Sequence, residues 1–377
     1  MDKNHKTNPI WGRIGKCAGA LSLVLAAALT LFPLGGEDAL AAVSAQIDSI
    51  NVSKTDSGEI VRPESTRLIP LGHTTGIKLF SQGAMVVGFA PVDASSQSSP
   101  AEKAGLRLGD LIIKVNDTPV DSNESMAQAV ESSQGSQLTI HFKRGEEEKT
   151  LQVKPVKDEA SGTYRIGAFV RDSLAGIGTI TFVDPENGAF GALGHGVADQ
   201  DTGELMPIGG GSLMPSQVAG VEKGEVGSPG ELVGEYDLTR DQGVLYQNTD
   251  SGIYGKITDP SLYEGRQALE TAPKSQIKEG KAQIIANVEG DDTAYYDVEI
   301  LKVYPDDDDE SNRNMMIKVT DKELLRKTGG IVQGMSGSPI VQNGKLIGAV
   351  THVLVNDPTR GYGIFIENML DTAYSLQ

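Results

Sequence analysis

The hydrophobic positions from residue 163 onward form short runs rather than long helical repeats. YRIGAFV, GIGTITFV, QIIANVEG, YYDVEILKVY, MMIKVT and KLIGAVTHV each have the length of a strand, and turns rich in glycine or polar residues separate them. Short apolar runs with few helical patterns between them are typical of an all-β sandwich or a pair of β-barrels. The pattern therefore predicts a mainly β domain over residues 163–377.

The pattern over residues 68–157 predicts a separate small unit that also contains helices. SPAEKAGLRLGDLIIKVNDTPV indicates a short helix from Pro100 to Ala104, a turn at Gly105 and then a strand, and MAQAVESS indicates a second helix. SQLTIHFKRGEEEKTLQVKPV alternates apolar and polar residues, as expected for a two-stranded hairpin that turns at Gly145. AEKAGLRLGDLIIKVND is the part of this unit that most clearly resembles a PDZ domain.

The resemblance to a PDZ domain implies a groove for a peptide. Gly76, Ile77, Lys78 and Leu79 match the position of the carboxylate-binding loop of that fold. There a peptide adds as an extra strand, and backbone N–H groups receive its terminal carboxylate. GIKL lacks the second glycine usual in this loop. The alternative is a small scaffold domain without a ligand.

The N-terminal segment has the pattern of a targeting sequence. Four basic residues lie at or before the start of an apolar run that extends from Cys17 to Leu34. Positive charge ahead of such a run is typical of a signal peptide or an N-terminal anchor. We therefore expect residues 1–42 to be a signal peptide or membrane anchor and residues 43–67 to be a polar tether. The body of the protein is expected outside the cytoplasm.

Composition and charge exclude several classes of function. A formal net charge of −18 argues against nucleic acid as the main partner, because no basic surface dominates. The one cysteine, Cys17, lies in the apolar N-terminal run, so a disulfide framework, a thiolate metal site and a cysteine nucleophile are all excluded. The acidic run PDDDDE after Tyr304 lacks the spacing of an EF-hand and is interpreted as a solvated loop.

Ser336 stands between glycines in the loop GMSGSP, which two short apolar runs follow. Serine becomes a useful nucleophile only when a base removes its proton and donors stabilise the oxyanion. Gly334 can adopt backbone angles that other residues avoid, so the N–H groups of Gly334 and Ser336 can converge on one point. The G-x-S-x-G elbow of α/β-hydrolases does not fit, because Ser338 occupies the last position.

The base must come from five histidines. His5 precedes the apolar run, and His73 and His141 belong to the predicted PDZ-like unit. His195 is bracketed by glycines in FGALGHGVAD, where a turn can hold an imidazole in a cleft, and His352 follows an apolar strand. We predict His195 as the base.

The loop GMSGSP is similar to the Gly-x-Ser-Gly-Gly-Pro nucleophile loop of chymotrypsin-like serine proteases, and the histidine precedes the serine as it does there. Met335 replaces the acidic residue that pairs with a newly freed N-terminus in the digestive enzymes. A more extensive resemblance is to the stage IV sporulation protein B family, which are serine peptidases of endospore-forming bacteria. It rests on GALGHGVAD, GEVGSPGEL and KVTDKELLRKTGGIVQGMSGSPIVQNGKLIGAVTHV, together with the N-terminal segment and the PDZ-like unit.

The family resemblance implies a catalytic triad of Ser336, His195 and Asp321, in which Asp321 orients the imidazole. Thr351, on the strand after the nucleophile loop, is implied as a hydroxyl that supports the triad carboxylate. No metal or organic cofactor is expected, because this mechanism needs none. The other candidates for the carboxylate are Asp199, Asp292 and Asp297.

The resemblance also implies a PDZ domain followed by a chymotrypsin-like β-barrel peptidase domain that is exported into the intermembrane space of the forespore. The expected substrates are a membrane-bound regulatory protein, whose cleavage activates intramembrane processing of a late sigma factor, and the chain's own tether. The N-terminal helix would link the protein to the membrane. The main alternative is a non-catalytic docking protein on a protease-like scaffold, and a general envelope quality-control protease is a further one.

Overall fold

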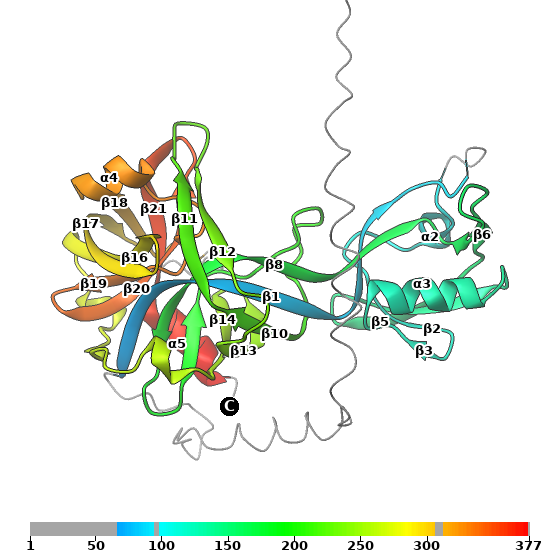
Figure 1. Cartoon of the computed structure of the whole chain (residues 1–377), viewed down its shortest axis with the longest axis horizontal. Helices are drawn as coiled ribbons and strands as arrows, with labels where there is room; N and C mark the ends of the chain where they lie inside the picture. Colours follow the sequence, from blue (N-terminus) through cyan, green and yellow to red (C-terminus); the bar gives the residue numbers. More distant parts are fainter. Residues whose placement is uncertain (1–65, 94–97, 306–311, 376–377) are drawn as a thin grey trace, which may run out of the picture. The chain divides into compact units, whose positions relative to one another are not determined.

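The computed structural model describes residues 66–93, 98–305 and 312–375 (Figure 1). The predicted targeting segment 1–42 and almost all of the tether 43–67 lie outside these residues, as does most of the acidic run after Tyr304. Within the described ranges, no helix combines the length and the apolar character that a membrane span requires.

Six antiparallel strands form a first barrel around a core that includes Leu71, Leu79 and Phe190. The pairing runs from β10 through β13, β14, β9 and β8 to β1, and a further pairing of β1 with β10 closes the ring. The strands are β1 (Arg67–Phe89), β8 (Ala168–Val183), β9 (Ala189–Ala192), β10 (Ile208–Met214), β13 (Gly243–Thr249) and β14 (Gly252–Ile257).

A second closed barrel of six strands follows in the chain, with Ile284, Ile317 and Met335 in its core. Its strands are β16 (Gly280–Glu289), β17 (Asp292–Val303), β18 (Met315–Val319), β19 (Pro339–Gln342), β20 (Lys345–Leu354) and β21 (Asp357–Phe365). Two helices belong to this half, α4 (Lys322–Thr328) and α5 (Ile366–Ser375). The prediction that this part of the chain is mainly β is confirmed.

The segment between the two barrels contributes a separate hairpin and several short elements. The hairpin joins β11 (Ser216–Glu222) to β12 (Glu231–Tyr236), and the Leu232 N–H donates to the carbonyl of Gln333 at 2.9 Å. This bond places β12 beside the loop that carries Ser336. The short elements are η2 (Pro260–Leu262), β15 (Leu269–Glu270) and η3 (Lys274–Gln276).

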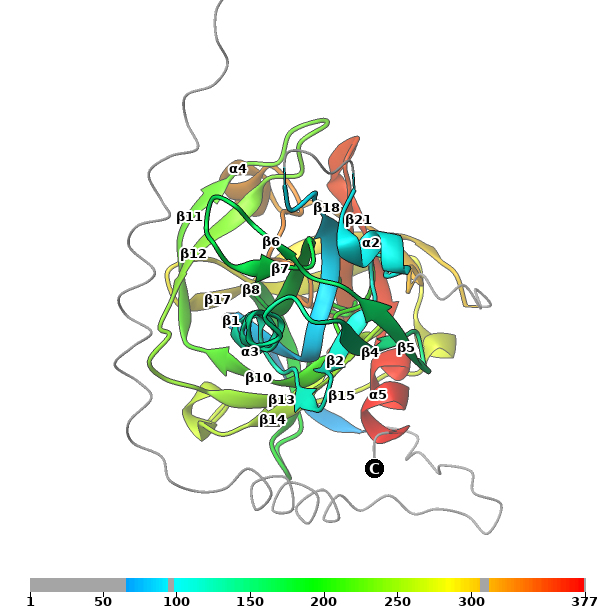
Figure 2. The ribbon, with the colours of Figure 1, turned by 90° about the vertical axis from the view of Figure 1, so that its right-hand side faces the viewer.

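The PDZ unit folds largely as its sequence pattern predicts. Helix α2 spans Pro100–Ala104, begins after the N-cap Ser99 and ends at Gly105, whose φ of 104° suits glycine. The strands β4 and β5 pair from Leu138↔Val153 to Arg144↔Glu147, so the hairpin turns at Gly145 as expected. Figure 2 shows this unit in front. Its elements are α2, β2 (Leu111–Val115), β3 (Thr118–Pro119), α3 (Asn123–Ser132), β4 (Leu138–Arg144), β5 (Glu147–Val153), β6 (Val156–Lys157) and β7 (Tyr164–Arg165).

The strands β1 and β8 each run through both the first barrel and the PDZ unit, so no domain boundary lies at residue 68. The first part of β1 pairs with β8 and β10 in the barrel, whereas Ala84 and Met85 pair with β2 of the PDZ unit. The PDZ unit is therefore inserted between two neighbouring strands of the first barrel. The expected order, a complete PDZ domain and then a complete peptidase domain, needs this correction.

The prediction that Gly76–Leu79 form the carboxylate-binding loop of the PDZ unit is wrong. These residues lie in the middle of β1, paired with Ala175–Ile177 and Leu174 of β8 on one side and with Gly211–Met214 of β10 on the other. A strand paired on both edges has no free row of N–H groups to offer a carboxylate. The sequence match failed because a short glycine-containing apolar stretch suits a barrel strand equally well.

Candidate active site

The nucleophile loop connects α4 to β19 and places Ser336 in a half-buried position. Gly334 and Gly337 adopt φ values of +92° and +97°, a region that residues with a side chain rarely occupy. The Ser336 hydroxyl donates a hydrogen bond to the carbonyl of Thr351 at 2.7 Å. The hydroxyl is thus held by the neighbouring strand rather than by an imidazole.

The carbonyl groups of this loop are tied to β8, and its N–H groups are not. The Thr179 hydroxyl donates to the Gly334 carbonyl at 2.7 Å, and the Thr179 N–H donates to the Ser336 carbonyl at 3.2 Å. No described group accepts a hydrogen bond from the N–H of Gly334 or of Ser336. Two free amides beside a serine hydroxyl can stabilise an oxyanion, as the sequence predicts for these two residues.

The loop that carries His195 and the loop that carries Ser336 both contact Thr179 of β8. Leu193 and Gly194 have φ values of +68° and +71°, which turn the chain sharply after β9, and the Leu193 N–H donates to the Thr179 carbonyl at 3.1 Å. A Cβ at Gly337 would lie 2.1 Å from the Thr179 oxygen and 2.6 Å from the Leu193 nitrogen. Only glycine permits this approach. The strand pattern GIGTITFV offered no signal that Thr179 joins the two loops.

His195 and Ser336 line one cavity of about 710 Å³. His195 Nδ1 lies 2.9 Å from the Gly196 carbonyl oxygen, which can only accept a hydrogen bond. The neutral ring therefore carries its proton on Nδ1 and leaves the Nε2 lone pair available as a base. Burial lowers the pKa of His195 below its usual value, although the bond to Gly196 opposes this. Burial thus favours the neutral imidazole, and the bond to Gly196 selects its tautomer.

The second candidate histidine, His352, lies beside the first. The two ring centroids are 5.3 Å apart with a tilt of 39°. Burial first, and then the proximity of His195 and Arg313, lower the pKa of His352 to about 4. His352 is not among the residues that line the cavity with Ser336. The geometry favours His195 as the base.

The structure does not bring Asp321 to His195. Asp321 is the N-cap of α4, and its Oδ1 accepts hydrogen bonds from the N–H groups of Glu323 and Leu324, each at 2.9 Å. Among the described residues, no hydrogen bond or ion pair links an aspartate to His195. The Gly196 carbonyl takes the position at Nδ1 that the expected triad gives to a carboxylate.

The other candidate aspartates are engaged elsewhere. Asp199 is completely buried, forms an ion pair with Arg171 and accepts hydrogen bonds from the N–H groups of Asp201 and Thr202. Asp297 accepts a hydrogen bond from Gln283 at 2.9 Å on an exposed part of β17, and Asp292 begins that strand.

The support expected from Thr351 is not formed by its hydroxyl. The Thr351 Oγ1 is buried and has no hydrogen-bond partner in the described part of the chain. Its backbone carbonyl accepts the Ser336 hydroxyl instead. Thr351 is thus placed next to the nucleophile through its main chain and not through the predicted side-chain contact with a carboxylate.

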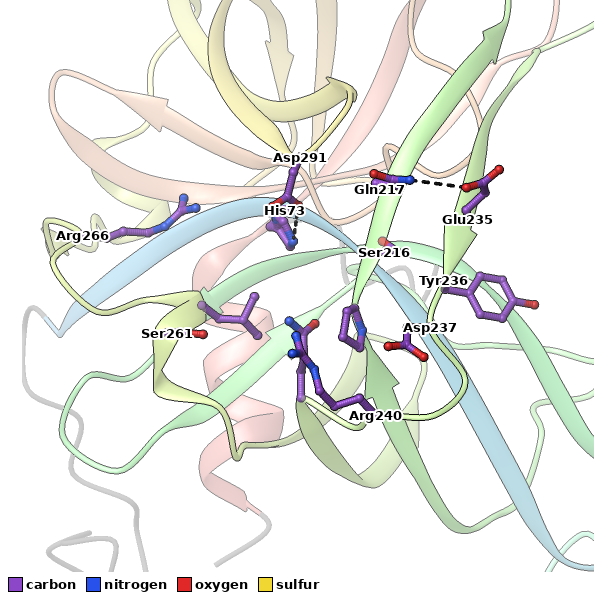
Figure 3. A pocket seen from close by; sticks show the side chains of 13 residues that line it. His73, Ser216, Gln217, Glu235, Tyr236, Asp237, Arg240, Ser261, Arg266 and Asp291 are labelled. Carbon is purple, nitrogen blue, oxygen red and sulfur yellow. Dashed lines mark hydrogen bonds and ion pairs between the residues drawn. The ribbon is translucent and has the colours of Figure 1, made fainter. Parts of the chain in front are cut away.

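A second cavity, of about 580 Å³, has Ser216, His73 and Asp291 among its lining residues (Figure 3). His73 Nε2 lies 3.4 Å from Asp291 Oδ1, and burial lowers the His73 pKa. No hydrogen bond connects Ser216 to His73 in the described structure, and Ser216 lies in a strand paired with Tyr236 rather than in a glycine loop. The set lacks the features that activate a nucleophile. His73 also belongs to the first barrel, not to the PDZ unit as its sequence position suggested.

The PDZ unit has a groove of its own, at a different place from the one predicted. A cavity of about 610 Å³ lies between α3 and residues 163–170, with Met126, Val130, Ile166 and Val170 among its lining residues. The Ile166 carbonyl accepts a hydrogen bond from the Ala101 N–H, so the chain there is fixed against α2. The groove of this unit is therefore bordered by residues 163–170 and not by Gly76–Leu79.

Comparison with known protein families gives two matches. The model of the SpoIVB peptidase S55 family matches residues 162–370, which is more than half of the chain, and a PDZ domain model matches residues 77–154. The first match contains both His195 and Ser336. The second match includes the α2–β2 segment from which the PDZ resemblance was recognised.

Curated relatives match over shorter stretches. A putative zinc metalloprotease, CPE1693, of Clostridium perfringens is 26% identical over 99 residues, which are 26% of this chain and 29% of the relative. The zinc metalloprotease RasP of Shouchella clausii is 36% identical over 22% of this chain and 21% of its own length. The mitochondrial serine protease HTRA2 of Bos taurus is 42% identical over 15% of this chain and 12% of its own length. The chain spans less than a third of each of these relatives.

Solved structures with similarity include the active form of the Rv3671c protease from M. tuberculosis, at a TM-score of 0.30 and 16% identity, covering 54% of this chain and 74% of that one. The PDZ domain of an SdrC-like protein from Listeria monocytogenes has a TM-score of 0.20 and 23% identity, and the match covers 24% of this chain and 87% of that one. These values are too low to carry an argument about the site.

Proposed function

Because the chain belongs to the SpoIVB peptidase S55 family and is a serine peptidase with a PDZ domain, we propose that Ser336 is its nucleophile and His195 its general base. The observation that carries the proposal is the meeting of their two loops at Thr179, which places both side chains on one cavity. The free N–H groups of Gly334 and Ser336 are proposed as the oxyanion hole.

The proposed reaction begins when the Ser336 hydroxyl turns from the Thr351 carbonyl toward His195. Nε2 of His195 takes the hydroxyl proton while Oγ attacks the scissile carbonyl, and the oxyanion is stabilised by the two amides. The imidazolium then protonates the leaving amine, and water hydrolyses the acyl-enzyme with His195 as base again. In this arrangement, the Gly196 carbonyl holds the tautomer of His195 that the first step needs.

The proposed physiological substrates are the chain's own N-terminal tether and the extracytoplasmic part of a membrane-bound regulatory protein. Cleavage of that regulator would release intramembrane processing of a late sporulation sigma factor, in the intermembrane space of the forespore. The support is the family membership together with a targeting pattern in residues 1–42. The groove between α3 and residues 163–170 would receive a peptide segment of one of these substrates.

Self-processing provides the first test. Protein that begins at residue 43 is purified as wild type, Ser336→Ala and Ser338→Ala, and the N-termini of the products are followed by mass spectrometry. Ser338 is a matched control, because its hydroxyl is buried without a hydrogen-bond partner in the described structure and lies two residues from Ser336. We expect time-dependent trimming in the wild type and in Ser338→Ala and none in Ser336→Ala.

Equal trimming of all three proteins would overturn the assignment of Ser336. A reporter of regulator cleavage in sporulating cells then separates the peptidase from the docking protein. Normal processing with Ser336→Ala would favour the docking protein, whereas loss of processing with a folded variant supports the peptidase.

A further inference from the structure

One stretch of β8 has an edge without a partner strand. On one side, β8 pairs with β1 in unbroken register from Ile180↔His73 to Ser173↔Phe80. On the other side, β9 pairs with β8 only at Ile180, Phe182 and Val183. Between Ser173 and Gly178, no described backbone group bonds to this second edge. Unpaired edges are normally covered or blocked, because they invite another chain to pair.

The direction of the backbone groups on this edge follows from Thr179. Its N–H and its carbonyl both bond outward, to Ser336 and Leu193 respectively. Backbone groups in an antiparallel ladder alternate between the two neighbouring strands. The N–H and carbonyl groups of Ile177 and Ala175 therefore also face outward, whereas those of Gly176 and Gly178 face β1. The open edge therefore ends at Thr179, whose N–H bonds to the carbonyl of Ser336.

The same edge lies in the cavity that contains His195 and Ser336. Leu174, Ala175, Gly176 and Ile177 all line it, and Ala175 and Gly176 are exposed with little or no side chain to block an approaching strand. A cavity of about 710 Å³ is large enough for more than one substrate residue. The unpaired stretch is therefore accessible from the site of the chemistry.

One wall of this cavity is aliphatic, and its lining arginine is already paired. Ile77 and Leu79 from β1, Leu193 and Val197 from the histidine loop, and Leu174 and Ile177 from β8 contribute aliphatic side chains. Arg171 also lines the cavity, but it is paired with Asp201 at 2.8 Å and with the buried Asp199. Beside these aliphatic side chains a charged substrate residue would lose its hydration, and an acidic one would find Arg171 already paired with two carboxylates.

We propose that the substrate binds as an extended strand on the open edge of β8 at Ala175–Ile177, with an aliphatic side chain next to the scissile bond in the cavity lined by Ile77 and Leu79. Main-chain hydrogen bonds supply the affinity and the apolar cavity supplies the specificity, as in other cases of strand addition. This inference rests on the proposed function, since it names the substrate class of the same site. It predicts that cleavage occurs in segments that lack regular structure and contain Val, Ile or Leu at the cut.

The side-chain part of the inference is tested with the wild-type protein and a mixture of peptides randomised on both sides of the cut. At one or more positions next to the scissile bond, kcat/KM for Val, Ile or Leu should exceed that for Asp or Lys by at least about tenfold. A preference for a charged residue at both flanking positions would overturn the inference. It would leave the peptidase assignment intact.

The strand-pairing part is tested by removing one outward N–H. Ala175→Pro eliminates the donor on the open edge without touching a hydrogen bond to β1, and Ala175→Ser is the matched variant that keeps it. With one good peptide from the mixture, kcat/KM of Ala175→Pro should be about tenfold below that of Ala175→Ser. Thermal unfolding of both variants checks that the barrel is folded. Equal kcat/KM values would overturn strand pairing at this edge.

A scan of N-methylated peptides with the wild-type protein makes the test independent of whether Ala175→Pro folds. Methylation of a substrate N–H that bonds to Ala175 or Ile177 should lower kcat/KM about tenfold, and methylation of the alternate residues should have little effect. A scan without this alternation contradicts the proposal. If wild type and Ser336→Ala cleave alike, the proposed function itself has failed, which is a distinguishable result.

Discussion

At the residue scale, the role proposed for His195 depends on its immediate surroundings rather than on a charged partner. The Gly196 carbonyl fixes the tautomer, and burial keeps the ring neutral by lowering its pKa. A buried carboxylate at Nδ1 would raise that pKa, as it stabilises the imidazolium. Because no carboxylate contacts His195 among the described residues, its pKa stays below the ordinary histidine value.

We expect kcat/KM to rise with pH through a single acidic limb whose midpoint lies below 6.5, the ordinary value for histidine. The base is active only when neutral, and the lowered pKa extends its neutral range toward acid. The check is a pH profile of peptide cleavage between pH 4 and pH 8. A midpoint above 6.5 would indicate that a carboxylate does reach His195 in the working enzyme.

His352, the neighbour of His195, makes stability depend on pH. The pKa of His352 is about 4 in the folded protein and near 6.5 when unfolded, so between these values the unfolded chain binds more protons. The free energy of unfolding should therefore fall as the pH drops through this window, which thermal unfolding at pH 7 and pH 4.5 can show.

Asp321 allows two roles to be separated by two substitutions. As an N-cap it holds the first turn of α4, so Asp321→Ala should lower the free energy of unfolding by about 1 kcal/mol, whereas Asp321→Asn preserves an acceptor for the cap. From the structure we expect Asp321→Asn to retain kcat/KM within a few-fold. A fall of about 10⁴ at unchanged stability would instead identify Asp321 as the orienting carboxylate of the family triad.

At the element scale, the site depends on how closely two loops approach the same strand. Gly337 is the contact point, because its missing Cβ leaves room for the backbone of Thr179 and Leu193. Gly344 offers a matched comparison, since it has a similar positive φ of +75° but no atom within 4 Å of the point that a Cβ would occupy. The two glycines share a positive φ and differ in contact.

We expect Gly337→Ala to lower kcat/KM about 100-fold, because an added methyl group pushes Ser336 away from His195. Gly344→Ala should cost only the strain of a left-handed residue, about 1 kcal/mol of stability, without loss of activity. Peptide cleavage and thermal unfolding of both variants provide the comparison. Similar losses in both would mean that the loop contact does not position the nucleophile.

At the scale of the whole molecule, β1 and β8 are the structural link between the barrel and the PDZ unit. Phe80 and Ser173 are Cα partners at the point where regular pairing in the barrel ends. Apart from Ser81↔Ile208, the barrel pairings of β1 involve residues up to Phe80, and those of β8 involve residues from Ser173 onward. The peptidase barrel should therefore close without the inserted unit.

We expect a variant in which Asn-Gly joins Phe80 to Ser173, and which carries Asp199→Asn, to fold cooperatively and to cleave a short peptide. The second change is needed because the excision removes Arg171 and would leave a buried carboxylate without its partner. Circular dichroism with thermal unfolding, followed by a cleavage assay, tests this. A variant that shows no cooperative transition would mean that the PDZ unit is part of the folding core.

The sequence by itself determined the local features of this protein. Helix α2 with its glycine stop, the β4–β5 hairpin, and the two glycine-bracketed loops around His195 and Ser336 all follow from patterns a few residues long. Their physical basis is short in range, since capping, turn conformation and alternation of apolar residues depend on near neighbours.

Only the tertiary structure decided which of these features meet. It placed Gly76–Leu79 inside a barrel strand and Asp321 at a helix cap, inserted the PDZ unit between β1 and β8, and made Thr179 the point of contact between the two loops. These outcomes depend on pairing between strands about a hundred residues apart, as for His73 and Ile180. Hydrophobic alternation makes a segment competent to pair but does not name its partner, so the partner is selected when the barrels close.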